Sequence, residues 1–239
     1  MPKKPVDIAK EIIERSGNTF HSKVLKYLQG KGWTVLISPY FNDNVTNKPR
    51  EIDLIAEKAF PMQNRWGSPA GNVNVKLFVE CKYITNITVF WFHDKDKQKA
   101  ENLVVSTTPL TEKNTYTDKH HYMAGIDKVA KLFADNRTKS SENEIFYKAL
   151  NQSLNAMVYY RKKKSIIELP PGRIDNTLET VNYPVIVCND FDRLFRVEID
   201  SESDPIRIDD NFLLEVNYAY LDSNGNDINE YFLIDILDF

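Results

Sequence analysis

The chain has few cysteines and no long apolar run, and both shortages narrow what it can be. Cys81 and Cys188 are the only cysteines among 239 residues, too few for a disulfide framework or an all-cysteine zinc site. We therefore expect a reducing, cytoplasmic setting. The longest apolar segments, 77–79 and 84–92, are short or interrupted by polar residues. Because a membrane-spanning helix needs roughly 18–20 apolar residues, no membrane partner is expected.

Signatures of several protein classes are also missing. The sequence contains no G-x-x-x-x-G-K-[ST] phosphate loop, which argues against intrinsic NTP hydrolysis, and no G-x-S-x-G nucleophile motif. His120 and His121 are adjacent, but the pattern of a histidine-based nuclease centre does not surround them. Residues 1–5 include two lysines, yet no apolar segment follows, so no secretory signal is expected.

A basic excess is absent as well. The 31 basic and 34 acidic residues give a net charge of −3, whereas proteins that hold nucleic acid by themselves usually carry surplus positive charge. Basic residues do cluster at 95–99 and 161–164, and the segment after Asp190 is acidic. A solvated helix end or loop is the plain alternative for each basic cluster. The overall balance favours a protein that relies on a protein partner or a homodimer for targeting.

The patterning predicts a mixed fold of α/β (α+β) class, in which a central mixed β-sheet is flanked by helices. A hydrophobic content of 42% is enough to bury a substantial core. From periodicity, capping residues and turn residues we expect helices over 5–15, 19–29, 121–135 and 142–161, strands over 33–37, 50–56, 73–83 and 183–188, a hairpin or loop insertion over 60–72, a long polar loop over 95–119, and a β-rich end.

Three charged residues stand out inside these apolar strands. Asp53 lies within the apolar letters of residues 52–55, and Glu80 and Lys82 follow on the next strand. Successive strand side chains point to opposite faces, so Glu80 and Lys82 emerge on one face, and pairing of the two strands brings Asp53 to Glu80. Buried charges are costly unless they are paired or hold a metal. The plain alternative is an ion pair on a solvated sheet beside a strand-edge acid, because short motifs match often by chance.

The strand segments "EIDLIA" and "FVECKY", preceded by an amphipathic helix, resemble the PD-(D/E)xK, or restriction-endonuclease-like, nuclease superfamily. The resemblance covers about residues 19–187 and implies a core in αβββαβ order. It places such a domain at 1–190, with a β-rich C-terminal extension at 191–239 packed on it. Asp53, Glu80 and Lys82 match the motif residues, which implies catalysis with Mg²⁺, or Mn²⁺ as a substitute, held by Asp53 and Glu80.

The resemblance also suggests supporting residues. His21 stands about where many members carry a helix glutamate that supports the metal, so it is a candidate third ligand; an ordinary surface histidine is the alternative. Gln152 is a candidate catalytic polar residue on the helix after the lysine strand, and a partly exposed helix residue is the alternative. The candidate phosphate contacts are Lys148, Arg161, Lys162 and Lys163.

The function that this resemblance implies is a metal-dependent endonuclease that hydrolyses phosphodiester bonds in DNA. Members commonly serve in restriction-like defence or in repair, so the chain is expected to be an effector or subunit of such a system. A nuclease-fold interaction subunit with weak or no activity, or an RNA-directed nuclease, stays open as an alternative.

Overall fold

The computed structural model describes residues 4–15, 17–44, 46–64, 66–108, 117–136, 145–161, 165–167, 169, 175–222 and 224–239. Their helices are α1 (Pro5–Arg15), α2 (Asn18–Gly30), α3 (Lys97–Thr107), the short 3-10 turn η1 (Thr117–Lys119) and α4 (Ile145–Tyr160). Their strands are β1 (Thr34–Ile37), β2 (Tyr40–Asn42), β3 (Pro49–Glu51), β4 (Leu54–Gln63), β5 (Pro69–Lys82), β6 (Thr88–Asp94), β7 (Lys128–Asp135), β8 (Thr177–Cys188), β9 (Leu194–Glu198), β10 (Ile206–Arg207), β11 (Phe212–Leu221) and β12 (Asp227–Asp238). The fold is thus mixed α/β of the α+β class, with a large mixed sheet flanked by helices.

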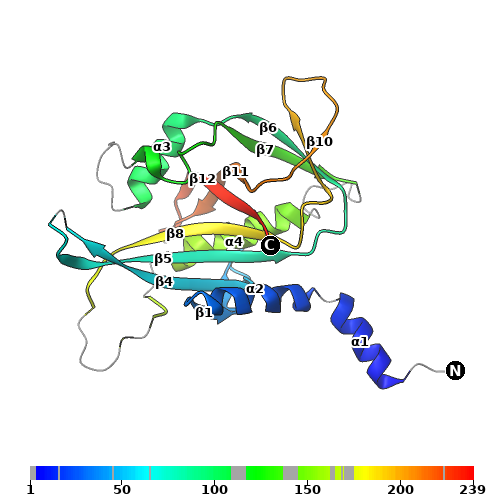
Figure 1. The fold of residues 1–239 in the computed structure, drawn as a ribbon, viewed down its shortest axis with the longest axis horizontal. Coiled ribbons are helices and arrows are strands. Elements are labelled where there is room, and N and C mark those ends of the chain that lie inside the picture. Colours follow the sequence, from blue (N-terminus) through cyan, green and yellow to red (C-terminus); the bar gives the residue numbers. More distant parts are fainter. Residues whose placement is uncertain are drawn as a thin grey trace.

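One sheet contains all of these strands except β2 and β3. Its order is β1-β4-β5-β8-β12-β11-β7-β6-β9-β10, and β2 and β3 form a separate hairpin (Figure 1). The strands β1, β4 and β5 are antiparallel neighbours, and β5, β8 and β12 run parallel. The strands β11 and β12, which follow residue 190, lie inside the sheet between β8 and β7.

Helices cover both faces of this sheet, and strand alternation sends side chains to each. Ile55 and Phe78 point to the side of α4 and join its core, whereas Leu54 and Val79 point to the side of α2. The helix α3 packs over Leu233 on β12, on the same face as α2. Because both faces are covered, the central strands are nearly continuous apolar runs.

The helices predicted over 5–15 and 19–29 are confirmed as α1 and α2. Phe20, Val24 and Leu28 recur on one side of α2 and are buried against the sheet. The helix α1 extends away from the sheet (Figure 1) and leaves Ile12 and Ile13 exposed. No helix in the described ranges is both long and apolar enough to cross a bilayer.

The prediction of a long loop over 95–119 is wrong for residues 97–107, which form the helix α3. Asp96 begins this helix, and its carboxylate accepts a hydrogen bond from the backbone N–H of Lys99 at 3.0 Å. Its own residues Ala100, Leu103 and Val104 recur at helical spacing and are buried against the sheet. Charged letters around this short stripe hid it in the sequence. Residues 109–116 of the predicted loop lie outside the described residues.

The prediction of a helix over 121–135 is also wrong, because residues 128–135 form the strand β7. Val129 and Ala130 are fully buried, and β7 pairs with β6 on one side and with β11 on the other. Gly125, with φ of 71°, ends the preceding turn. Pairing with two distant strands therefore outweighs a local helical periodicity.

The single strand predicted over 50–56 is two strands. The strand β3 pairs with β2, β4 pairs with β1 and β5, and the chain crosses from the hairpin to the sheet at Ile52 and Asp53. The insertion predicted over 60–72 is a hairpin extension, in which β4 continues to Gln63 and β5 begins at Pro69. Asp53 consequently lies at the start of β4, in a bend and not in the middle of a strand.

Candidate active site

Two hydrogen bonds hold Asp53 against the Glu80–Cys81 segment of β5. Leu54 is the Cα partner of Val79, which sets Asp53 beside the carboxyl end of β5. The Asp53 Oδ2 atom accepts a hydrogen bond from the backbone N–H of Cys81 at 2.7 Å, and Glu80 Oε1 accepts one from the backbone N–H of Asp53 at 3.3 Å. The structure thus brings the two carboxylates that the strand pattern singles out to one place.

Lys82 completes this cluster. Its Nζ atom donates to Glu80 Oε2 at 2.6 Å, and the two side chains share one face of β5 because they are two residues apart. The Glu80 side chain is 1% exposed and that of Lys82 is 19% exposed. The lysine side chain is therefore partly exposed, while the carboxylate beside it is enclosed.

Burial and charge set the protonation of this pair. Burial raises the pKa of Glu80 to about 7, with a further increase from the charge of Asp53, although Lys82 opposes both. Burial alone lowers the pKa of Lys82, but the charges of Glu80 and Asp53 and the hydrogen bond to Glu80 together outweigh burial and raise it. Lys82 is consequently a cation at neutral pH.

These residues fit a hard divalent cation. Mg²⁺ takes oxygen ligands and is commonly held by one or two carboxylates, with water and phosphate oxygens completing its shell. Asp53 Oδ1 has no hydrogen-bond partner in the described part of the chain, and each carboxylate oxygen carries two lone pairs. The raised pKa of Glu80 marks a buried charge whose burial is only partly compensated, and a bound cation would supply the missing compensation.

His21 lies at the same edge of the sheet, but the structure does not join it to a ligand set. The neighbouring ring of Phe20 packs edge-on against Phe239 at 5.5 Å, and Phe239 follows β12, which runs parallel to β8 and β5 toward the edge that contains Lys82. The Nε2 atom of His21 is enclosed and finds no hydrogen-bond partner among the described residues. Across those residues no group of three or more His, Cys, Asp or Glu side chains is arranged to hold a metal.

Gln152 and Lys148 both lie on α4 beside the β2–β3 hairpin. The Gln152 side chain is half-buried and donates from Nε2 to the carbonyl oxygen of Glu51 at 3.0 Å, two residues before Asp53. Lys148 is exposed one turn earlier. The Gln152 side chain thus contacts the main chain next to the carboxylate cluster. Its hydrogen bond to Glu51 stabilises the segment that carries Asp53.

Arg161 is engaged inside the protein. Its Nη1 atom donates to Glu230 Oε1 at 2.9 Å, and Nη2 donates to the hydroxyl of Tyr220. The fold thus engages this guanidinium with Glu230 and Tyr220, and a phosphate contact by Arg161 stays a prediction. Lys162 and Lys163 lie outside the described residues.

A second acid–lysine pair lies on the same face of the sheet and differs in one respect. Glu57 and Lys76 are cross-strand partners 3.4 Å apart, and both side chains are buried. The Glu57 carboxylate also accepts hydrogen bonds from Asn74, from the hydroxyl of Ser165 and from the backbone N–H of Ile166. This pair is satisfied and closed to solvent, so it holds the segment after α4 in place.

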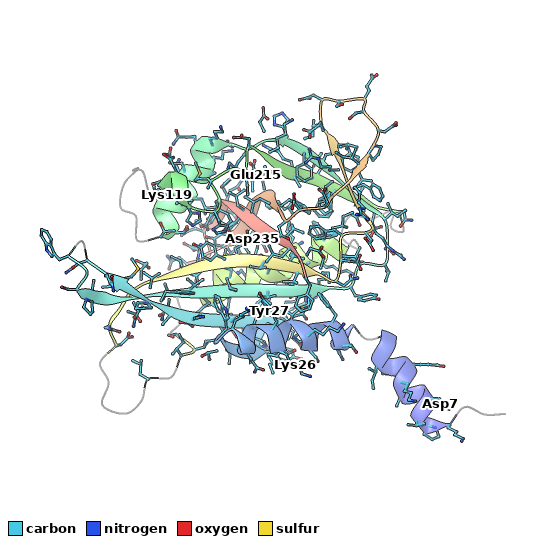
Figure 2. All side chains as sticks on the ribbon, in the orientation of Figure 1. Asp7, Lys26, Tyr27, Lys119, Glu215 and Asp235 are labelled. Atoms are coloured by element: carbon cyan, nitrogen blue, oxygen red, sulfur yellow. The ribbon has the colours of Figure 1, made fainter. Side chains whose placement is uncertain are left out.

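The adjacent histidines form a third polar cluster, away from the carboxylates. His120 Nε2 contacts the hydroxyl of Tyr183 at 3.0 Å, and His121 Nε2 contacts Asp235 Oδ2 at 3.3 Å. Figure 2 labels Asp235 on β12. Burial, with a smaller effect of His121, lowers the pKa of His120 to about 4, so this ring is neutral at physiological pH. The contacts fasten the turn before β7 to the sheet.

Sequence patterns did not predict a role for Arg50 or Tyr147, which line a cavity together with Gln152. The cavity has a volume of about 430 Å³ and lies between the β2–β3 hairpin and α4. Nearly a hundred residues separate these two elements, so no local pattern could reveal it. The only sequence signal was the position of Arg50, three residues before Asp53.

Comparisons of the chain with protein-family models, with characterised proteins and with solved structures find no match. The case for a function therefore rests on the residues and their geometry.

The burial of Glu80 predicts a pH-dependent stability in metal-free protein. The unfolded chain deprotonates Glu80 near its ordinary value of 4.5, whereas the folded chain keeps the proton until about pH 7. The folded state binds more protons between these values, so the free energy of unfolding should fall by on the order of 3 kcal/mol as pH rises through this window.

Urea denaturation in EDTA at several pH values measures this fall. Glu80→Gln should remove most of it, while Glu202→Gln, at an exposed position, should keep it. An unchanged pH slope in Glu80→Gln would show that Glu80 titrates normally.

Proposed function

We propose that the chain is a metal-dependent nuclease that hydrolyses phosphodiester bonds, with Asp53, Glu80 and Lys82 as its catalytic centre. The observation that carries this proposal is the convergence of two carboxylates and a protonated lysine at one sheet edge, with the lysine side chain partly exposed. A structural ion pair would be closed and satisfied, as Glu57 and Lys76 are. The Asp53–Glu80–Lys82 cluster instead keeps a buried carboxylate of raised pKa behind an accessible cation.

The order of elements supports the same proposal. The helix α2, the antiparallel strands β1, β4 and β5, the helix α4 and the strand β8 follow one another in that sequence, and the four strands are neighbours in the sheet. This is the αβββαβ order that the resemblance to PD-(D/E)xK nucleases implies. The elements β6, α3 and β7 are inserted between β5 and α4.

The chemistry assigned to each residue follows from its charge. Asp53 and Glu80 would hold Mg²⁺, which when bound supplies Lewis-acid polarisation of a phosphate and lowers the pKa of a bound water. Lys82 would orient the attacking water and offset the negative charge that builds up on the phosphate oxygens. In hydrolysis the attacking water gives up a proton as its oxygen bonds to phosphorus, one P–O ester bond breaks, and the departing oxygen takes up a proton to leave as an alcohol.

DNA is the proposed substrate, and the near-neutral net charge suggests that a protein partner or a second copy assists targeting. The biological setting, restriction-like defence or repair, stays a prediction.

A cleavage assay tests the proposal. The purified full chain is incubated with plasmid, linear single-stranded DNA and RNA, each with Mg²⁺, Mn²⁺ or EDTA. Cleavage of DNA with either metal and none in EDTA is expected. Cleavage of RNA alone would redirect the substrate assignment, and no cleavage under any condition would contradict the proposal in favour of an interaction subunit.

A further inference from the structure

A cavity next to the carboxylates has the lining of a nucleotide-binding pocket. Its volume of about 430 Å³ lies within the range of small-ligand sites. Tyr147 supplies an aromatic ring, and Asn151 and Gln152 supply amides. The nitrogen of each amide donates a hydrogen bond to a main-chain carbonyl, and the amide oxygens have no hydrogen-bond partners among the described residues. Acceptors beside a ring suit the amino and imino groups of a nucleobase.

The cavity wall is built before any ligand arrives. The β2–β3 hairpin is tied to α4 at three points along the helix: Gln152 to the carbonyl of Glu51, Tyr160 to the carbonyl of Tyr40, and Asn44 to Asn155. These bonds are 2.7–3.3 Å long. A pocket held open in this way loses little entropy when it binds.

Two cations stand on the cavity lining, where a nucleotide would present its phosphate. Arg50 is 51% exposed and pairs with Asp43 at 3.5 Å, while Asp43 also accepts a hydrogen bond from the backbone N–H of Thr46 at 2.7 Å. Lys148 has no ion-pair partner in the described part of the chain. The lining therefore carries a net positive charge.

The position of the cavity relates it to the carboxylates. Arg50 and Gln152 line it, Gln152 bonds to the carbonyl of Glu51, and Asp53 follows Glu51 by two residues. The cavity therefore adjoins the segment that carries Asp53.

We propose that this cavity, between the β2–β3 hairpin and α4, holds an unstacked nucleobase beside the cleaved phosphate. The substrate is accordingly a DNA strand with an unpaired nucleotide at the cut position. This inference rests on the proposed nuclease function. A paired base must first be unpaired and unstacked before it can enter the cavity, and this costs free energy. That cost is the source of the selectivity for an unpaired nucleotide over a paired one.

Binding in EDTA tests the cavity separately from catalysis. A fluorescent oligothymidylate strand and a fully paired duplex of the same length are titrated with the full chain. The wild type should bind the strand at least tenfold more tightly than the duplex. Tyr147→Ala should weaken strand binding about tenfold, as expected for loss of one base–aromatic stack, and Tyr147→Phe should retain it.

The helix α2 offers a matched control on the opposite face of the sheet. Tyr27 and Lys26 are an exposed aromatic–lysine pair there (Figure 2), as Tyr147 and Lys148 are on α4. Tyr27→Ala should leave strand binding unchanged. Wild-type affinity of Tyr147→Ala, or equal wild-type affinity for strand and duplex, would overturn the cavity assignment. Metal-dependent cleavage without strand selectivity would contradict the cavity alone, whereas strand-selective binding without cleavage would support the cavity and contradict the nuclease.

Discussion

Asp53→Asn is expected to lower the rate of metal-dependent DNA cleavage by about a thousandfold, equivalent to roughly 4 kcal/mol of transition-state stabilisation. The asparagine keeps the size of the side chain and an oxygen that can accept the hydrogen bond from Cys81. It removes the negative charge that a divalent cation requires. The initial rate of cleavage of linear single-stranded DNA at saturating Mg²⁺ measures the effect, with thermal unfolding as the check that the fold is retained.

Lys82→Met should reduce the same rate by about a hundredfold, the usual cost of losing one group that stabilises developing negative charge. Asp204→Asn and Lys26→Met make the same chemical changes at exposed positions and should cleave at the wild-type rate. Equal cleavage rates for Asp53→Asn and Asp204→Asn would show that Asp53 has no role in cleavage. The catalytic centre would then lie elsewhere.

Glu57→Ala is expected to reduce the free energy of unfolding by about 3–5 kcal/mol. It leaves the ammonium of Lys76 enclosed, at 2% exposure, without its counter-charge. It also removes the acceptor for Ser165 and for the backbone N–H of Ile166. Urea denaturation at pH 7 measures the loss.

The double variant Glu57→Ala, Lys76→Met separates charge from packing. Removing the ammonium should restore about 2 kcal/mol or more, because an apolar side chain of similar length tolerates the buried site. The residual loss reflects the hydrogen bonds to Ser165 and Ile166, about 1 kcal/mol each. A double variant no more stable than Glu57→Ala would show that the ion pair is not the source of the effect.

Residues within one strand were predictable because strand geometry is local. Glu80 and Lys82 share a face by alternation alone, and that face is observed. The pairing of β4 with β5, which brings Asp53 to Glu80, followed from their order and from apolar letters around the charges. The buried stripe of α2 likewise needed only its own residues.

Segments whose partners are distant in sequence were mispredicted. The strand β7 carries a local helical periodicity but is fixed by β6 and β11, and the β11 segment begins more than seventy residues later. The bend at Asp53 arises because β3 and β4 join different sheets. Arg161 had the letters of a phosphate contact, and only the fold showed Glu230 beside it.

The sequence by itself determined the chemical character of the candidate site: two acids and a lysine in apolar strands, in an order that resembles a nuclease core. Its short-range periodicities sufficed because neighbouring side chains on one strand or helix are placed by backbone geometry. Only the tertiary structure decided which charges are open and which are closed. Glu80–Lys82 and Glu57–Lys76 are both acid–lysine pairs, and their difference lies in what packs over them, a contact between segments far apart in the chain. The cavity near Asp53 has the same origin, since the β2–β3 hairpin and α4 are nearly a hundred residues apart in the chain and meet only in the folded structure.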